Sequence, residues 1–361
     1  MKTGKTLEAL GVEVLRRANS RKDYLADTRR VTPLFENFPA LRLAGAGDTA
    51  FAIQPWAHGQ LAEHAGIPQA YYDRMLRDAP ALWQTNIGHW LREKPSLHLV
   101  RTLDDQVRAW LSDRYRPLDN EELIEAVLPA LAEAQAEIVS AEITDKRLYI
   151  KALDPRLRGF IRQGTHEFQR FEDEIVWGIC ISNSEVGAGR LSVRTFFVRS
   201  ICSNAAIVES VFGQFHLGGR LGSGEPGIQD SGIYLRDETR MAKDKALFLE
   251  LRDVVRGTLT EAMMRKTLDK LSVAAGLPIT GDVPKVVEVT ARRLGLTDGE
   301  RTSVLQHLIK GGDLTAWGLT NAVTRTAADS ESYDRATEIE RLGMQVIELP
   351  RRDWEIIAAA A

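Results

Sequence analysis

The sequence predicts an α+β protein: a mixed, mainly antiparallel sheet with packed helices, followed by a C-terminal helical module. Apolar residues alternate with polar ones in short segments between residues 97 and 202, the two-residue period of strands. Beyond residue 235 the apolar residues follow helical spacing to the end of the chain. A hydrophobic content of 44% and a charged content of 27% are ordinary for a chain that buries a core.

The pattern of apolar and polar residues divides the 361 residues into three parts. We expect an N-terminal helix and basic arm at residues 1–35, an α+β core domain at 36–235 and a helical C-terminal module at 236–361. A glycine-rich loop at 218–232 ends the core domain.

In the first hundred residues the spacing predicts a helix over 6–18, a basic arm or ordered loop over 21–35, and strands at 41–43 and 51–53. Helical segments follow at 60–65 and 70–79. Gly66 can end the first of these helices, and Pro68 is preset for the first turn of the next.

Strands are then expected at 97–103 and 106–111, joined by a hairpin turn at Asp104-Asp105. A helix over 118–134 should be kinked or interrupted by Pro129. Further strands are expected at 137–143, 147–153, 175–182 and 190–202. The remaining predicted helices cover 237–264, 284–293, 298–310, 315–326 and 333–342, and 344–348 could be a closing strand.

Three of the expected strands each combine an apolar face with a basic face. The basic faces hold Gln106, Arg108 and Trp110 in one strand, Arg147, Tyr149 and Lys151 in another, and Arg190, Ser192 and Arg194 in the third. Such faces could pair arginines with phosphates and offer rings for base stacking. They could equally be the solvated faces of a one-sided sheet.

The loop between the last two strands is a candidate ligand loop, because its glycines allow close backbone approach. It lacks the spacing of a phosphate loop or a dinucleotide fingerprint, so a long hairpin turn is the competing interpretation. The residues concerned are Asn183, Ser184, Glu185, Gly187 and Gly189, with Asn204 as a possible backbone contact where the next strand ends.

Familiar catalytic and metal-binding patterns do not occur in this sequence. The seven histidines show no zinc-type spacing, and we expect no metal and no cofactor. Cys202 with His216 as its base would be a conceivable thiol site, although a cysteine in a hydrophobic strand is usually inert.

The two cysteines are expected to be reduced thiols of a cytoplasmic protein, because the N-terminal residues have the pattern of a charged helix and not of a signal peptide. We expect no contact with a membrane, because no stretch approaches the roughly 20 apolar residues of a membrane span. The net charge of −3 neither indicates nor excludes nucleic-acid binding.

Six segments of the sequence are distinctive: GIP at 66–68, YYDRM at 71–75, LSDRYRPLDN at 111–120, ISNSEVG at 181–187, RxxCxN at 199–204 and WGLTNAVT at 317–324. Together they resemble the phage/plasmid-like protein family of unknown function, domain of unknown function 932. The resemblance runs from about residue 24 to 349 and departs from the family pattern at Ala205-Ala206, where Asn-Gly is usual.

This resemblance implies a product of a phage, plasmid or integrated element, whose genes commonly serve recombination, replication or evasion of host defence. Together with the basic faces it favours a non-enzymatic protein that binds single-stranded DNA and anneals strands as a homo-oligomer. The expected contacts are Arg108, Trp110, Arg147, Tyr149, Lys151, Arg190, Arg194 and Arg199. The alternatives are an enzyme with a pocket around residues 183–189, Cys202 and His216, or an adaptor that binds a host protein.

Overall fold

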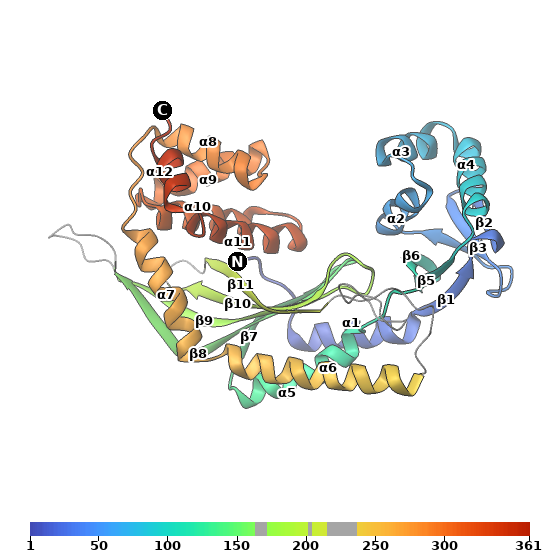
Figure 1. Ribbon diagram of the computed structural model, residues 1–361, viewed down its shortest axis with the longest axis horizontal. Helices are drawn as coiled ribbons and strands as arrows, with labels where there is room; N and C mark the ends of the chain where they lie inside the picture. The colour runs from blue at the N-terminus through green and yellow to red at the C-terminus, as the bar shows by residue number, and fades with distance from the viewer. Residues whose placement is uncertain (163–171, 201–203, 215–236) are drawn as a thin grey trace.

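The computed structural model describes residues 1–162, 172–200, 204–214 and 237–361. It confirms the predicted α+β class, with antiparallel sheets in the first two thirds of the chain and helices at the C-terminal end. Two separate sheets are present, each with its own helices (Figure 1). The strands expected in one mixed sheet are therefore divided between two sheets.

The first sheet has six strands in the order β1-β5-β6-β4-β3-β2, and only β4 and β6 run parallel. Helices α2 (Pro55–Ala65), α3 (Gln69–Asp78) and α4 (Pro80–Glu93) pack on it around Phe51 and Trp83. The strands are β1 (Lys22–Asp27), β2 (Val31–Phe35), β3 (Pro39–Leu43), β4 (Ala50–Ile53), β5 (Leu97–Leu103) and β6 (Gln106–Ser112).

Gly66 ends α2 as predicted. Its φ of 66° is in the left-handed region, where glycine carries no Cβ penalty, and its N–H donates to the carbonyls of Ala62 and Glu63. Pro68 is the N-cap of α3. These local signals act within a few residues, so the sequence alone could locate them.

The second sheet has five antiparallel strands in the order β11-β10-β9-β8-β7. The predicted separation of faces holds in β8 and β10, whose residues Ile150 and Val193 pack into one core while Tyr149 and Arg194 point to the opposite face. The strands are β7 (Glu137–Ile143), β8 (Leu148–Arg162), β9 (Glu172–Asn183), β10 (Leu191–Arg199) and β11 (Ala205–Gln214).

Helices cover one face of this second sheet at the bottom of Figure 1. They are α1 (Leu7–Ser20), α5 (Asn120–Glu133) and α6 (Asp237–Thr258), and they enclose a core with Leu10, Val127 and Leu251. Pro129 lies inside α5 without interrupting it.

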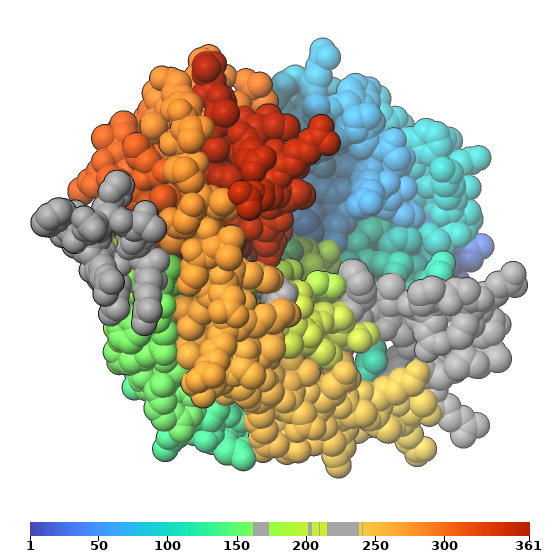
Figure 2. All heavy atoms as spheres, turned by 60° about the vertical axis from the view of Figure 1, so that its left-hand side comes forward, coloured from blue at the N-terminus to red at the C-terminus, as the bar shows by residue number. Residues whose placement is uncertain are grey.

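A bundle of helices covers the opposite face (Figures 1 and 2). Helices α7 (Glu261–Ala275), α10 (Ala316–Thr326) and α11 (Tyr333–Ile347) lie closest to the strands, with Trp317 packed on Phe197. Helices α8 (Val283–Leu294), α9 (Asp298–Gly311) and α12 (Arg351–Ala358) complete the bundle. The sheet is therefore the middle of three layers.

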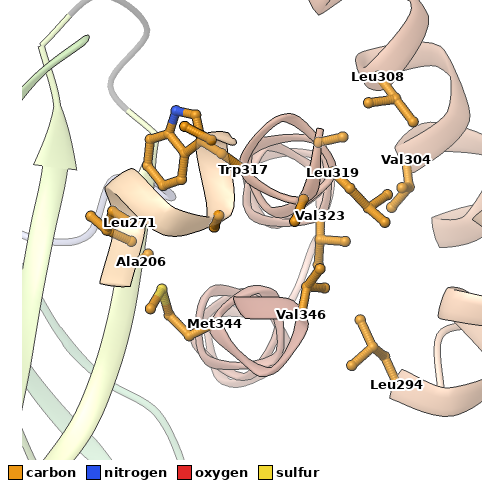
Figure 3. Packing of buried hydrophobic residues seen from close by; sticks show 14 of the residues in the cluster. Ala206, Leu271, Leu294, Val304, Leu308, Trp317, Leu319, Val323, Met344 and Val346 are labelled. Atoms are coloured by element: carbon orange, nitrogen blue, oxygen red, sulfur yellow. The ribbon is translucent and has the colours of Figure 1, made fainter. Parts of the chain in front are cut away.

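Helix α11 is fixed by contacts on two sides. Figure 3 shows Met344 next to Ala206 of β11 and Leu271 of α7, while Val346 points the other way, towards Leu294 of α8. This packing determines which side chains of α11 face the sheet.

Two predicted elements at the ends of the chain are wrong. The basic arm at 21–35 contains β1, a 3-10 turn at Thr28–Arg30 and β2, because β1 pairs with β5 far along the chain. The closing strand at 344–348 is instead the end of α11, where packing on both sides favours a helix. The glycine-rich loop at 218–232 and the proposed boundary at 235 lie outside the described residues.

Among the described residues, no helix combines the length and the apolar character that a bilayer-spanning segment requires.

Candidate functional site

A cavity of about 650 Å³ lies between the five-stranded sheet and α11. Six basic and two acidic side chains line it, so the balance of charge is strongly positive. We call it the arginine cavity. Its basic residues are Lys146, Arg147, Arg190, Arg194, Arg335 and Arg341, and its acidic residues are Asp334 and Glu338.

Four of the predicted nucleic-acid contacts line this cavity: Tyr149 and three arginines. Arg147 precedes β8, Arg190 precedes β10, and Arg194 lies within β10. Gly189 makes room for Arg147, because a Cβ at position 189 would lie 2.4 Å from its guanidinium. The Arg147 guanidinium donates to the carbonyl of Ala188. The sequence predicts a basic face for each of the two strands, and the structure brings these three arginines to the same cavity.

The positive charges of the arginine cavity are not neutralised by the acidic residues that line it. Arg194 and Arg341 are half-buried, and neither forms an ion pair or hydrogen bond with any residue that the structure describes. The two acidic residues are already engaged: Asp334 accepts from the Tyr149 hydroxyl at 2.8 Å, and Glu338 accepts from Arg335 at 2.7 Å.

Burial, followed by the like charges of Arg341 and Arg190, lowers the pKa of Arg194. Guanidinium nevertheless stays charged in proteins, so the repulsion persists at neutral pH. Half-buried like charges raise the energy of a folded protein unless a counter-charge is supplied. An anionic ligand would supply it.

Two predicted contacts next to the arginine cavity are buried and do not face solvent. Lys151 has no exposed surface and pairs with Glu340 of α11, with 2.5 Å between Nζ and Oε2. Tyr149 is also buried, and its ring packs against Tyr333 at 5.4 Å between centroids. The prediction that they lie on an exposed basic face is wrong, because α11 covers this part of the sheet.

Arg108 is the third misplaced contact. The pairing of β5 with β6 shifts register between Arg101 and Thr102, which leaves Arg108 of β6 without a partner in β5. The strict two-residue alternation therefore fails at Arg108. Arg108 is 3% exposed and donates to Glu185 Oε2 at 2.8 Å. It contributes to the junction of the two sheets and does not contact solvent.

Glu185 is the centre of a buried charge network at this junction. Its Oε1 accepts from the backbone N–H of Asn120 at 2.8 Å. Arg101 of β5 has no exposed surface and donates to Asp119 at 2.8 Å and to the backbone carbonyl of Glu185 at 3.0 Å. We call Arg101, Arg108, Asp119 and Glu185 the junction network.

The predicted ligand loop at 183–189 is mainly a structural connection. Asn183 donates to the Leu118 carbonyl at 2.7 Å, and the Ser184 carbonyl accepts from the Tyr115 hydroxyl at 2.8 Å. The side chains of Asn183, Ser184 and Glu185 are buried, so they are not available as ligand contacts. The two glycines, Gly187 and Gly189, do border cavities.

Arg199 and Asn204 lie at the far end of β10 from the arginine cavity. Arg199 pairs with Asp173, and Asn204 donates to the Asn321 carbonyl of α10 at 3.2 Å. They connect the sheet to the helical bundle. The prediction that they join the other candidate residues in one site is therefore wrong.

A second cavity, of about 560 Å³, adjoins the first. Both cavities are lined by Gly189 and Arg190, so they meet at the β9–β10 turn. We call the second cavity the aromatic pocket, because it is lined by His64, His98, Trp110 and Tyr115. Trp110 is only 4% exposed and is not on a solvent-facing strand face as predicted.

The thiol chemistry considered from the sequence has no support in the described residues. Cys202 and His216 lie outside them. Cys180 borders the arginine cavity, but burial raises the pKa of its thiol to about 11, so the reactive thiolate is disfavoured. Within the same described ranges, no group of three or more potential ligands is arranged to hold a metal ion.

Sequence reasoning missed Arg341 and the two histidines of the aromatic pocket. The spacing of Asp334, Glu338 and Arg341 places them on one polar face of α11, opposite its apolar face. The polar face of this helix could be predicted from the sequence. The position of the helix over the sheet could not, because β8 and α11 are almost two hundred residues apart.

No family model, curated protein or solved structure matches this chain. The resemblance to the phage/plasmid-like family therefore stays a prediction.

Proposed function

We propose that this protein binds single-stranded nucleic acid, preferentially single-stranded DNA, and that the arginine cavity binds the phosphate groups of the strand. The observation that carries the proposal is the pair of half-buried guanidiniums, Arg194 and Arg341, for which no described residue supplies a counter-charge. Guanidinium groups match phosphate geometry well and bind it through two parallel hydrogen bonds.

The choice of a nucleic acid over a simple anion is supported by the surroundings of the arginine cavity. Five arginines and a lysine line it, and its two carboxylates already accept hydrogen bonds, so the excess of positive charge suits a polyanion better than a single weak charge. The adjoining aromatic pocket provides rings beside these arginines, the combination that single-strand binders use.

The proposal is for binding and not for catalysis. Self-association of the protein and annealing of strands, in a phage-like or plasmid-like genetic context and in the cytoplasm, belong to the same proposal and follow from the family resemblance.

The test is the affinity of a fluorescently labelled single strand, measured by anisotropy across a salt titration. The variant Arg194→Gln/Arg341→Gln should bind at least about tenfold more weakly than wild type, because two charge-assisted contacts are lost. The slope of log K against log salt should fall by about 1.4, since each phosphate contact on a single strand contributes about 0.7.

The matched control is Arg265→Gln/Arg352→Gln, which removes two exposed arginines from the helical module without touching the arginine cavity. It should bind like wild type. Equal affinity and equal salt slope for the cavity variant and the control would contradict the proposal. A duplex of the same sequence, run in parallel, measures the preference for single strands.

A further inference from the structure

The aromatic pocket is built from rings that are already ordered. His98 of β5 stacks on Trp110 of β6 with 5.0 Å between centroids and 26° between planes. His64 of α2 meets His98 edge to face at 4.3 Å. Three rings from three elements thus form one wall of the pocket.

Both histidines are neutral near pH 7. Burial, followed by the neighbouring His64, lowers the pKa of His98 to about 4. Burial, followed by the charge of Lys94, lowers the pKa of His64. Neutral imidazoles do not attract phosphate, so the aromatic pocket differs in chemistry from the arginine cavity beside it. It suits an uncharged planar ring.

Two polar atoms of this wall lack hydrogen-bond partners among the described residues: Trp110 Nε1 and His64 Nε2. Both atoms are buried without accessible surface, so an occupant of the aromatic pocket would contact the rings and not these two atoms.

The two cavities are joined at Gly189 and Arg190, which line both. A nucleotide likewise joins a planar base to a charged phosphate through one sugar. We infer that the aromatic pocket is a nucleobase subsite, which takes a base of the same strand whose phosphates occupy the arginine cavity. This inference rests on the proposed function and adds to it a contact that depends on bases.

The test compares two labelled strands of equal length, one ordinary and one in which every base is replaced by hydrogen at an abasic sugar. Wild type should bind the ordinary strand about tenfold more tightly, since the stacking of a base on an aromatic side chain adds to the affinity. His98→Ala should lose most of this preference, and His98→Phe, which keeps a ring for stacking, should retain it.

His64→Ala should weaken the preference as well, and it provides a second variant in case His98→Ala perturbs the fold. His89→Ala is the control, because His89 is exposed on α4 and contacts Trp90, not the aromatic pocket. Circular dichroism and thermal unfolding confirm that each variant is folded.

The possible outcomes separate the two proposals. Equal, salt-sensitive binding of ordinary and abasic strands by wild type would overturn the nucleobase subsite and leave phosphate binding standing. An unchanged preference in folded His98→Ala and His64→Ala would overturn the assignment to this pocket. Failure of wild type to bind either strand would overturn the proposed function itself.

Discussion

The arginine cavity and the junction network use the same side chain in opposite ways. In the junction network, Arg101 and Arg108 are almost fully buried, and each is paired with a carboxylate at 2.8 Å. In the arginine cavity, Arg194 and Arg341 are only half-buried, and neither is paired with a residue in the described ranges. The more deeply buried arginines are the ones that have carboxylate partners.

The difference separates arginines whose charge the fold itself compensates from arginines whose charge it leaves uncompensated. A buried charge whose partner is removed destabilises a protein strongly, so the junction arginines must keep their carboxylates. An uncompensated charge at a cavity works against folding and is tolerated where function requires it. Counting positive side chains on a strand does not make this distinction.

The largest expected effect concerns the compensated region. Glu185→Gln leaves Arg108 buried without a counter-charge, and we expect it to lower the free energy of unfolding by about 3–5 kcal/mol. Urea denaturation followed by circular dichroism measures this. Glu250→Gln, at an exposed position of α6, is the control and should change stability by less than about 0.5 kcal/mol. A comparably small loss for Glu185→Gln would remove the contrast between the two regions.

The pH dependence of the same variant sharpens the comparison. Burial acts to raise the pKa of Glu185, but Arg108 and Arg101 outweigh it and lower the pKa below the ordinary value of 4.5. A carboxylate with a lowered pKa adds stability above its unfolded pKa, and this stability is lost as the pH falls below that value.

Wild type should therefore lose more stability than Glu185→Gln on acidification below pH 4.5, and the difference in the free energy of unfolding between the two proteins should narrow. Denaturation curves at several pH values between about 7 and 3 test this. A difference that stays constant, or widens, over this range would show that the charge of Glu185 is not what stabilises the junction.

The smallest expected effect concerns the uncompensated region. Without ligand, Arg194→Gln should leave the free energy of unfolding unchanged or raise it by up to about 1 kcal/mol, because it removes repulsion and breaks no ion pair. The measurement is urea denaturation in low-salt buffer free of phosphate, with Arg265→Gln as the control. A loss of more than about 2 kcal/mol would mean that Arg194 supports the fold as the junction arginines do.

The sequence predicted correctly those features that depend on neighbours along the chain. Gly66 ends a helix, and the alternation of β8 and β10 separates Ile150 and Val193 from Tyr149 and Arg194. These follow from backbone conformation and from the two-residue period of a strand. The same period predicts that Arg190 and Arg194 share a face of their strand, whereas the approach of Arg147 to them depends on the pairing of β8 and β10 with β9.

Other features of the candidate site were not predictable from local patterns. Arg108 was misplaced because a register shift in the β5–β6 pair breaks the alternation at that residue. Lys151 was misplaced because its partner, Glu340, comes from a helix near the C-terminus. Residue type alone does not reveal whether a lysine or arginine on a strand faces solvent or a buried carboxylate.

The sequence by itself thus determined the α+β class, most of the helices and strands, and which side chains share a strand face, because these depend on short-range periodicity. Only the tertiary structure decided that α11 covers the basic face and turns part of it into a cavity. It also decided which positive charges are compensated, because pairing depends on segments that meet only when the chain is folded. Whether the charge of an arginine is compensated is therefore a property of the packed molecule and not of the local sequence.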